Sequence, residues 1–135
     1  MINYPPKILA ALSEAIDENT DILYWLMKNG YPELAAIANS IHLNNEAFDW
    51  LMKNKFPQFA AFTKAVWGNP KAYYWLKQHQ FDFLIKLADA TRGNKLALQW
   101  FKDEQLEIFI LIAKKTEAVI KRKNHELNDY HKLHF

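Results

Sequence analysis

The sequence predicts an all-α fold: a right-handed α-solenoid of four 25-residue helix–turn–helix repeats preceded by a half-repeat helix. Three observations lead to this prediction. Tryptophan recurs every 25 residues, at Trp25, Trp50, Trp75 and Trp100. The residues around each tryptophan recur with the same period. Each period contains two stretches with the apolar spacing of an amphipathic helix, and a constant period of this length is typical of stacked structural repeats.

The repeat register divides the chain into segments 21–45, 46–70, 71–95 and 96–120. A large apolar residue follows every tryptophan, namely Leu26, Leu51, Leu76 and Phe101. Six positions after each tryptophan the chain has Tyr31, Phe56, Phe81 and Leu106. Residues 6–19 align with the second half of a repeat, so they form the half-repeat. Because a two-helix unit cannot bury its apolar face alone, we expect the units to stack around a continuous core.

Each unit is expected to form two helices. In segment 46–70, Ala47, Trp50 and Leu51 share one face of the first helix, and Phe59 and Phe62 begin the i, i+3, i+4, i+7 pattern of the second. The pattern predicts helices at about 7–17, 21–29, 32–43, 46–54, 57–67, 70–79, 82–91, 95–103 and 105–123.

Turn residues support these boundaries. Pro32 and Pro57 stand where second helices begin, and proline is well tolerated at a first helical position. Gly68 and Gly93 stand where second helices must stop. The expected N-caps of the first helices are Thr20, Asn45, Asn69 and Asn94.

The stretch KNGYPELAAIA at 28–38 resembles the helix–loop–helix core of an ankyrin repeat. The resemblance covers about half of each unit and implies architecture only, since the ankyrin hairpin and its T-P-L-H signature are missing. No specific family is indicated. We expect Trp50 and Trp75 to be largely buried between neighbouring units, because a large aromatic residue repeated once per unit suits packing. A stacking platform for bases or a ligand is the alternative interpretation.

Composition and charge restrict the classes of protein to consider. The chain has no cysteine, which excludes disulfides and thiolate metal sites and is compatible with a cytoplasmic location. No apolar run approaches the roughly 20 residues of a membrane-spanning helix, and the first residues do not have the pattern of a signal peptide. Residues 1–49 contain two basic and seven acidic side chains, whereas residues 50–135 contain fifteen and eight. We expect one domain at 1–123 and a polar tail at 124–135.

The sequence contains no recognisable catalytic or cofactor-binding pattern. Ser13 and Ser40 are not in a nucleophile turn, and Gly30, Gly68 and Gly93 cannot form a phosphate-binding loop. The tail contains His125, His131 and His134, but a zinc site needs three or four ligands on a fixed scaffold. We therefore expect no enzyme activity, no cofactor and no metal.

The predicted function is non-enzymatic protein binding or assembly through the exposed sides of the first helices, which we expect to form a concave face. The residues expected on this surface are Tyr24, Met27, Asp49, Met52, Tyr74, Lys77, Gln99 and Lys102. The alternative is a nucleic-acid-binding repeat protein that uses the basic C-terminal half. The cations concerned are Lys114, Lys115, Lys121, Arg122 and Lys123. We do not favour nucleic acid, because the net charge of the chain is only +2. An enzyme with a site in the groove ranks last.

The C-terminal end departs from the repeat. Residues 108–112 form an unbroken apolar run, whereas a terminal repeat normally has a polar outer face. We expect Ile108 and Leu111 to be covered by a second copy of the chain in a homodimer. The alternative is that the tail folds back over them through Leu127, Tyr130, Leu133 and Phe135.

Overall fold

The computed structural model describes the backbone of residues 1–134 and the side chains of residues 1–128. This part of the chain is all-α, with no strand. Its helices are α1 (Pro6–Ile16), α2 (Thr20–Lys28), α3 (Pro32–Ile41), α4 (Asn45–Lys53), α5 (Pro57–Ala65), α6 (Pro70–Gln78), α7 (Asp82–Thr91), α8 (Lys95–Asp103) and α9 (Glu107–His134). The prediction of short successive helices is confirmed, and only the end of the last helix differs by more than two residues. No helix in the described range combines the length and the apolar character that crossing a membrane requires.

An asparagine caps the N-terminus of every first helix. The side-chain oxygens of Asn19, Asn44, Asn69 and Asn94 accept the backbone N–H three residues later, at 2.9–3.2 Å. The capping positions expected at Thr20 and Asn45 are therefore wrong by one residue, since both are already inside their helices. Asparagine suits this position because its short side chain reaches an N–H group that has no partner within the helix.

Each turn between the short helices contains one residue with positive φ. These residues are Glu18, Leu43, Gly68 and Gly93 after the half-repeat and second helices, and Gly30, Lys55, Gln80 and Gln105 after the first helices. Every such turn also has a backbone hydrogen bond from residue i to residue i−5, for example from Tyr31 to Leu26. This arrangement ends a helix in a left-handed residue and satisfies its last carbonyl groups.

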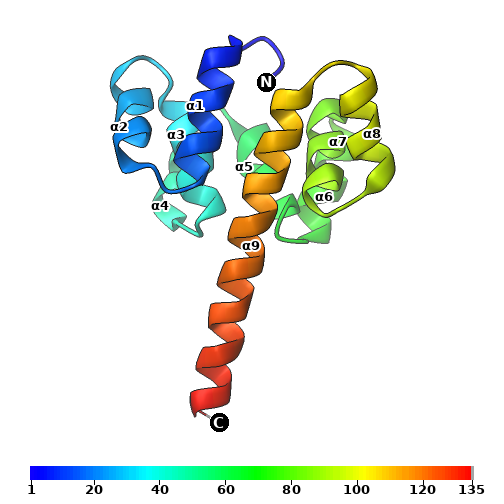
Figure 1. The fold of residues 1–135 in the computed structure, drawn as a ribbon. Helices are drawn as coiled ribbons and strands as arrows, with labels where there is room; N and C mark the ends of the chain where they lie inside the picture. The colour runs from blue at the N-terminus through cyan, green and yellow to red at the C-terminus, as the bar shows by residue number, and fades with distance from the viewer. Residues whose placement is uncertain (135) are drawn as a thin grey trace.

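Helix α9 continues past the point where the other second helices stop. In the register of Gly93 and Asn94 it has Ala118 and Val119, and it therefore lacks both the glycine and the asparagine cap. The helix runs unbroken through residue 123, and the expected domain at 1–123 with a polar tail at 124–135 stays a prediction. Figure 1 shows its last turns projecting from the body, which is not the expected fold-back of the tail. Tyr130, Leu133 and Phe135, which that expectation used, lie outside the residues whose side chains are described.

The repeats curve until the two ends of the stack meet. Helices α1, α3, α5, α7 and α9 contact one another in this order, and α9 also contacts α1 (Figure 1). Helices α2, α4, α6 and α8 pack on the outside of this ring, where none of them contacts another within the described residues. The molecule is thus a solenoid-like stack of two-helix units closed into a ring.

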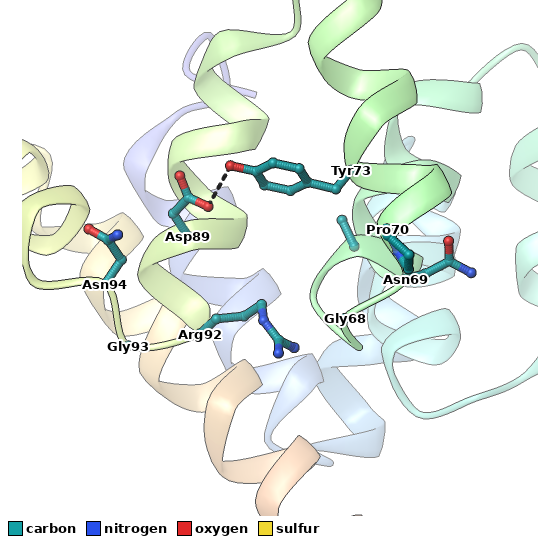
Figure 2. Close-up of a pocket in the computed structure, with 9 residues that line it drawn as sticks. Gly68, Asn69, Pro70, Tyr73, Asp89, Arg92, Gly93 and Asn94 are labelled. Carbon is teal, nitrogen blue, oxygen red and sulfur yellow. Dashed lines mark hydrogen bonds between the residues drawn. The ribbon is translucent and has the colours of Figure 1, made fainter.

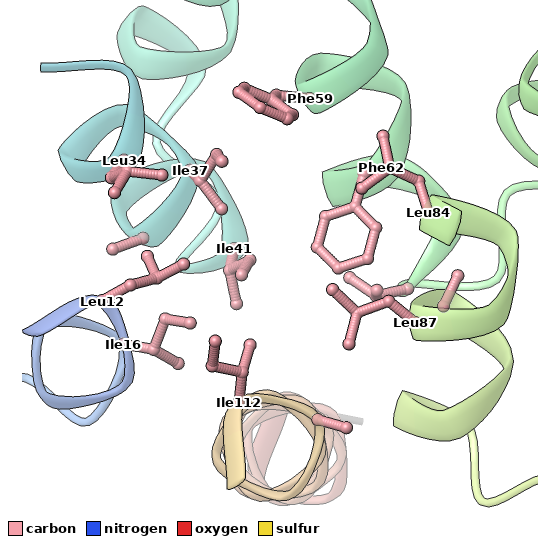
Figure 3. Close-up of a cluster of buried hydrophobic side chains, with 14 of the residues drawn as sticks. Leu12, Ile16, Leu34, Ile37, Ile41, Phe59, Phe62, Leu84, Leu87 and Ile112 are labelled. Atoms are coloured by element: carbon pink, nitrogen blue, oxygen red, sulfur yellow. The ribbon is translucent and has the colours of Figure 1, made fainter. Parts of the chain in front are cut away.

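The ring interior is the hydrophobic core. Figure 3 shows side chains from all five inner helices pointing towards its centre, with Leu12, Ile37, Phe62, Leu87 and Ile112 among them. All five are almost completely buried. The expected concave face is therefore wrong: the inner side of the curve is filled with side chains, and the first helices form the convex outer side.

Two ion pairs join the ends of the chain. Lys115 Nζ lies 2.7 Å from Asp17 Oδ2, and Arg122 Nη2 lies 3.4 Å from Glu18 Oε1. Hydrogen bonding to Asp17 and its negative charge raise the pKa of the Lys115 ammonium group. Helix α1 thus provides, within one chain, a neighbour for the apolar α9.

Successive units are also joined by a repeated hydrogen bond that the sequence analysis did not identify. In each case a side-chain N–H donates to the backbone carbonyl 26 residues earlier, at the end of the preceding inner helix. The pairs are His42 to Ile16 at 2.7 Å, Trp67 to Ile41 at 3.0 Å and Arg92 to Val66 at 3.2 Å. Three different residue types perform the same role, which explains why the pattern is not visible as a repeated letter.

Candidate functional site

The eight residues expected on the working surface are all exposed. They come from the four outer helices, so they lie on the outer rather than the concave side of the stack. The large apolar members are Tyr24, Met27, Met52 and Tyr74, which are 54%, 49%, 51% and 61% exposed. The other members are Asp49, Lys77, Gln99 and Lys102. Among these eight residues, α2, α4 and α6 therefore present the apolar ones and α8 presents Gln99 and Lys102, although α8 also exposes Leu96 at its start.

The repeated tryptophans belong to the same outer surface. Trp25 is 44% exposed, and Trp50, Trp75 and Trp100 are partly exposed. Trp50 and Trp75, which were expected to be largely buried between neighbouring units, are partly buried side chains that pack against the core. Three of the tryptophan rings also stack on the aromatic residue six positions later, at centroid distances of 5.8–6.5 Å: Trp25 on Tyr31, Trp50 on Phe56 and Trp75 on Phe81.

A groove of about 230 Å³ lies between α2 and α4. Met27 and Trp50 line it from the two outer helices, and Ala35 and Ala36 of α3 line it from the inner layer. Glu46 also lines it and is the only ionisable residue that does so. This groove combines a partly buried indole ring, small apolar residues and one carboxylate.

Lysine side chains cover aromatic rings farther along the stack. Lys64 Nζ lies 4.6 Å from the centroid of the Phe48 ring, and Lys77 Nζ lies 5.1 Å from that of Tyr73. Lys86 Nζ lies 4.9 Å from the centroid of the Trp100 ring. Each distance is within the range of a cation–π interaction. The apolar surface of the later units is thus partly occupied by the chain's own cations.

A second groove, of about 490 Å³, lies where α5, α6 and α7 meet (Figure 2). Tyr73 Oη donates a hydrogen bond of 2.9 Å to Asp89 Oδ1 across it. Partial burial and this carboxylate raise the pKa of the Tyr73 phenol. One guanidinium N–H of Arg92 donates a hydrogen bond to the backbone carbonyl of Val66. Grooves in the equivalent register lie between the earlier units, with volumes of about 510 and 310 Å³. The groove is therefore a general feature of the stacking, and its polar groups bond mainly with the chain itself.

The basic cluster near the C-terminus is largely paired with carboxylates. Lys115 and Arg122 bind Asp17 and Glu18, and Lys121 Nζ lies 3.7 Å from Glu117 Oε1. Lys115 and Arg122 thus help to close the ring, whereas Lys114 and Lys121 are exposed on α9. Binding of nucleic acid by this cluster stays the alternative prediction.

The histidines and carboxylates of the described residues do not gather into a metal site: no group of three or more is placed to hold a metal ion. His131 and His134 lie outside the residues whose side chains are described.

Ile108 is partly buried and Leu111 is 40% exposed, although α1 packs along α9. Their neighbours Phe109, Ile112 and Ala113 are buried in the core. Less apolar surface of α9 is therefore left for a second chain to cover than the unbroken apolar run at 108–112 implied. A homodimer through Ile108 and Leu111 stays a prediction.

The fold and the outer surface define an all-α protein of stacked two-helix units. No protein-family model, curated protein or solved structure matches this chain significantly. The resemblance of residues 28–38 to an ankyrin repeat therefore concerns only the form of the two-helix unit, and no family is shown for the chain.

Proposed function

We propose that this protein is a non-enzymatic protein-binding or assembly module that holds its partner on the outer face of α2, α4 and α6. The observation that carries the proposal is the strip of exposed large apolar side chains on these helices. The strip consists of Tyr24, Trp25, Met27, Met52 and Tyr74. Within this proposal the repeats are ankyrin-like helix–loop–helix units without a hairpin, and the protein acts in the cytoplasm.

The residue types of the strip suit contact with another protein. Tyrosine and tryptophan combine a large apolar surface with a polar group, and aromatic residues and methionine are enriched in protein interfaces. Methionine also adapts its shape to irregular surfaces. Single exposed apolar residues are common on any protein, but these recur on neighbouring helices in equivalent positions: Tyr24 and Tyr74 are two repeats apart, and Met27 and Met52 are one repeat apart.

The closed ring also favours the outer face. A stack that closes on itself has no open inner curve, and here the interior is filled by Ile37, Phe62 and Leu87. A partner can reach only the outer helices, the turns and the ends of the molecule. Of these, the outer helices α2, α4 and α6 contribute four of the large apolar residues that are about half exposed or more.

The proposal is tested with a variant in which Tyr24, Met27, Met52 and Tyr74 are all changed to serine. A matched control changes four exposed polar residues of α1 and α9, namely Lys7, Glu14, Lys114 and Glu126, to serine. Both variants and the unaltered protein are used to capture proteins from the source cells, after circular dichroism has shown equal helix content.

We expect the unaltered protein and the control to capture the same partner, and the strip variant to lose it. Equal capture by all three proteins would contradict the assignment of this surface. Retention on RNA or DNA that falls steeply with salt, and that the strip variant keeps, would instead support the nucleic-acid-binding alternative.

A further inference from the structure

The repeats allow one groove to be compared with another at equivalent positions. Between the third and fourth units, the Lys86 ammonium group lies 4.9 Å from the centroid of the Trp100 ring. The negative face of an indole attracts a cation at this distance. The chain therefore contains, between α7 and α8, an occupied example of how a lysine fits against a repeat tryptophan.

The same two positions in the groove between α2 and α4 are Ala36 and Trp50, 50 residues earlier. Both line this groove of about 230 Å³. Alanine ends at its Cβ atom, so the space that the Lys86 side chain takes in the later unit is left open beside Trp50. The groove beside Trp50 can therefore accept from another molecule the kind of cation that Lys86 of the third unit places over Trp100.

Glu46 gives the groove between α2 and α4 a negative charge. The equivalent residues in the next two units are Lys71 and Leu96, so the carboxylate occurs here alone among the three. The next unit also has alanine, Ala61, opposite Trp75, but Lys71 there would repel a cation. The surrounding segment is acidic as well, with two basic and seven acidic side chains in residues 1–49. Among the grooves between two outer helices, the α2–α4 groove thus combines a tryptophan that faces alanine rather than lysine with a negative charge. The residues one unit earlier are Ala11, Asp21 and Trp25, but no outer helix precedes α2 to complete a groove there.

We propose that the groove between α2 and α4 binds a lysine or arginine side chain of the partner protein, with its cation over Trp50 and beside Glu46. This inference rests on the proposed function and specifies the partner as a basic segment with apolar flanking residues. Met27, Pro32 and Ala35 line the rest of the groove and suit the alkyl part of such a side chain and an apolar neighbour.

The test uses a blocked five-residue peptide with one lysine between two leucines, and NMR spectra of the five tryptophan indole N–H groups of the full chain. We expect the Trp50 signal to shift more than the others on titration. Arginine should replace lysine with similar or better affinity. Norleucine, which keeps the alkyl chain without the charge, should bind roughly 2- to 30-fold more weakly, as loss of a cation–π interaction implies.

Two substitutions copied from the later units make the test specific. Ala36→Lys reproduces Lys86 of the third unit and should abolish the Trp50 shift by filling the groove. Ala61→Lys makes the same change in the next groove and should leave the shift intact. Glu46→Lys reproduces the third unit and should weaken binding of the lysine peptide but not of the norleucine peptide.

No shift of Trp50, or equal shifts with lysine and norleucine, would overturn the proposal. Loss of the shift in Ala61→Lys as well as in Ala36→Lys would also overturn it. Failure of the peptide to bind this groove can be distinguished from failure of the proposed protein-binding function. The peptide reports on the groove without the natural partner, whereas the four-serine variant reports on partner capture.

Discussion

Adjacent residues of the repeat have opposite roles. Leu51 is completely buried beneath α4, while Trp50 beside it is partly exposed and stacks on Phe56 at 6.1 Å. The same contrast holds for Leu26 and Trp25. The residue after each tryptophan, leucine in three units and Phe101 in the fourth, therefore holds the outer helix on the core, and the larger tryptophan remains partly exposed.

This difference predicts unequal effects of truncation on stability. Leu51→Ala should lower the free energy of unfolding by about 2–5 kcal/mol, because it leaves a cavity in the core. Trp50→Ala should cost less, below about 3 kcal/mol, because part of the ring is already in water. Urea denaturation of both variants measures the difference, and a larger loss for Trp50→Ala would contradict the burial described above.

Tyr4 predicts how stability depends on alkaline pH. Its hydroxyl donates to Glu33 Oε1 at 3.3 Å, and burial, followed by the charge of Glu33, raises the pKa of the Tyr4 phenol above its usual value near 10. Because the folded-state pKa is the higher one, the neutral phenol stabilises the fold fully below pH 10. This contribution falls as the pH rises above 10 towards the folded-state pKa.

We therefore expect the urea midpoint to fall above pH 10, and Tyr4→Phe to reduce that fall. Tyr73 and Lys115, whose pKa values are also raised, keep part of the dependence in the variant. Tyr24→Phe, at an exposed position, is the control. A Tyr4→Phe protein with the full pH dependence would show that Tyr4 does not contribute to it.

At the scale of the elements, the short helices are fixed chiefly by how they end. The four asparagine caps and eight left-handed turn residues recur with the 25-residue period, although only three of the eight are glycine. Where both signals are missing, at Ala118 and Val119, the helix continues. Turn chemistry therefore determines the division into two-helix units.

The two neighbouring asparagines at the start of α4 provide a matched test of capping. Asn44 Oδ1 accepts the backbone N–H of Ala47 at 2.9 Å, while Asn45 is the first residue of the helix. Asn44→Ala should lower the free energy of unfolding by about 0.5–2 kcal/mol, and Asn45→Ala should change it little. Thermal denaturation of the two variants gives the comparison, and a greater loss in Asn45→Ala would place the cap one residue later than we describe.

The sequence predicts the helices well, because period, apolar spacing and turn residues all act over short distances. It does not predict how strongly the stack curves. That depends on the sizes of facing side chains, with Ala35, Ala38 and Ala60 in the inner layer and the tryptophans in the outer layer. Small inner residues and large outer residues favour strong curvature. The sum of small rotations per unit decides whether the ends meet, and no single motif records that sum.

The candidate surface was predictable only in part, because helical periodicity is local whereas the spacing of the helices is not. The residues beside each tryptophan were expected to be exposed because helical periodicity directs them away from the core. The partial exposure of Trp50 and the opening beside Ala36 depend on the spacing of α2 and α4, which is a property of the curve. Comparing each position with its equivalents, such as Ala36 with Lys86, is the signal that would have identified the groove from the sequence.

At the scale of the whole molecule, closure is the feature from which the other conclusions follow. It gives the apolar helix α9 a neighbour in α1, fills the inner side of the stack, and leaves the outer helices as the surface for a partner. An open stack would expose Ile16 and Ile112 at its two ends, whereas both are buried here.

The absence of cysteine and the 2.7 Å contact between Lys115 Nζ and Asp17 Oδ2 allow closure to be tested on the unaltered chain. A carbodiimide joins a carboxylate directly to an amine that touches it, and mass spectrometry of the digest identifies the joined residues. Mixing unlabelled and ¹⁵N-labelled protein before the reaction distinguishes links within a chain from links between chains. The closed ring predicts an Asp17–Lys115 link within single chains. A digest without any link between α1 and α9, or with such links only between labelled and unlabelled chains, would contradict it.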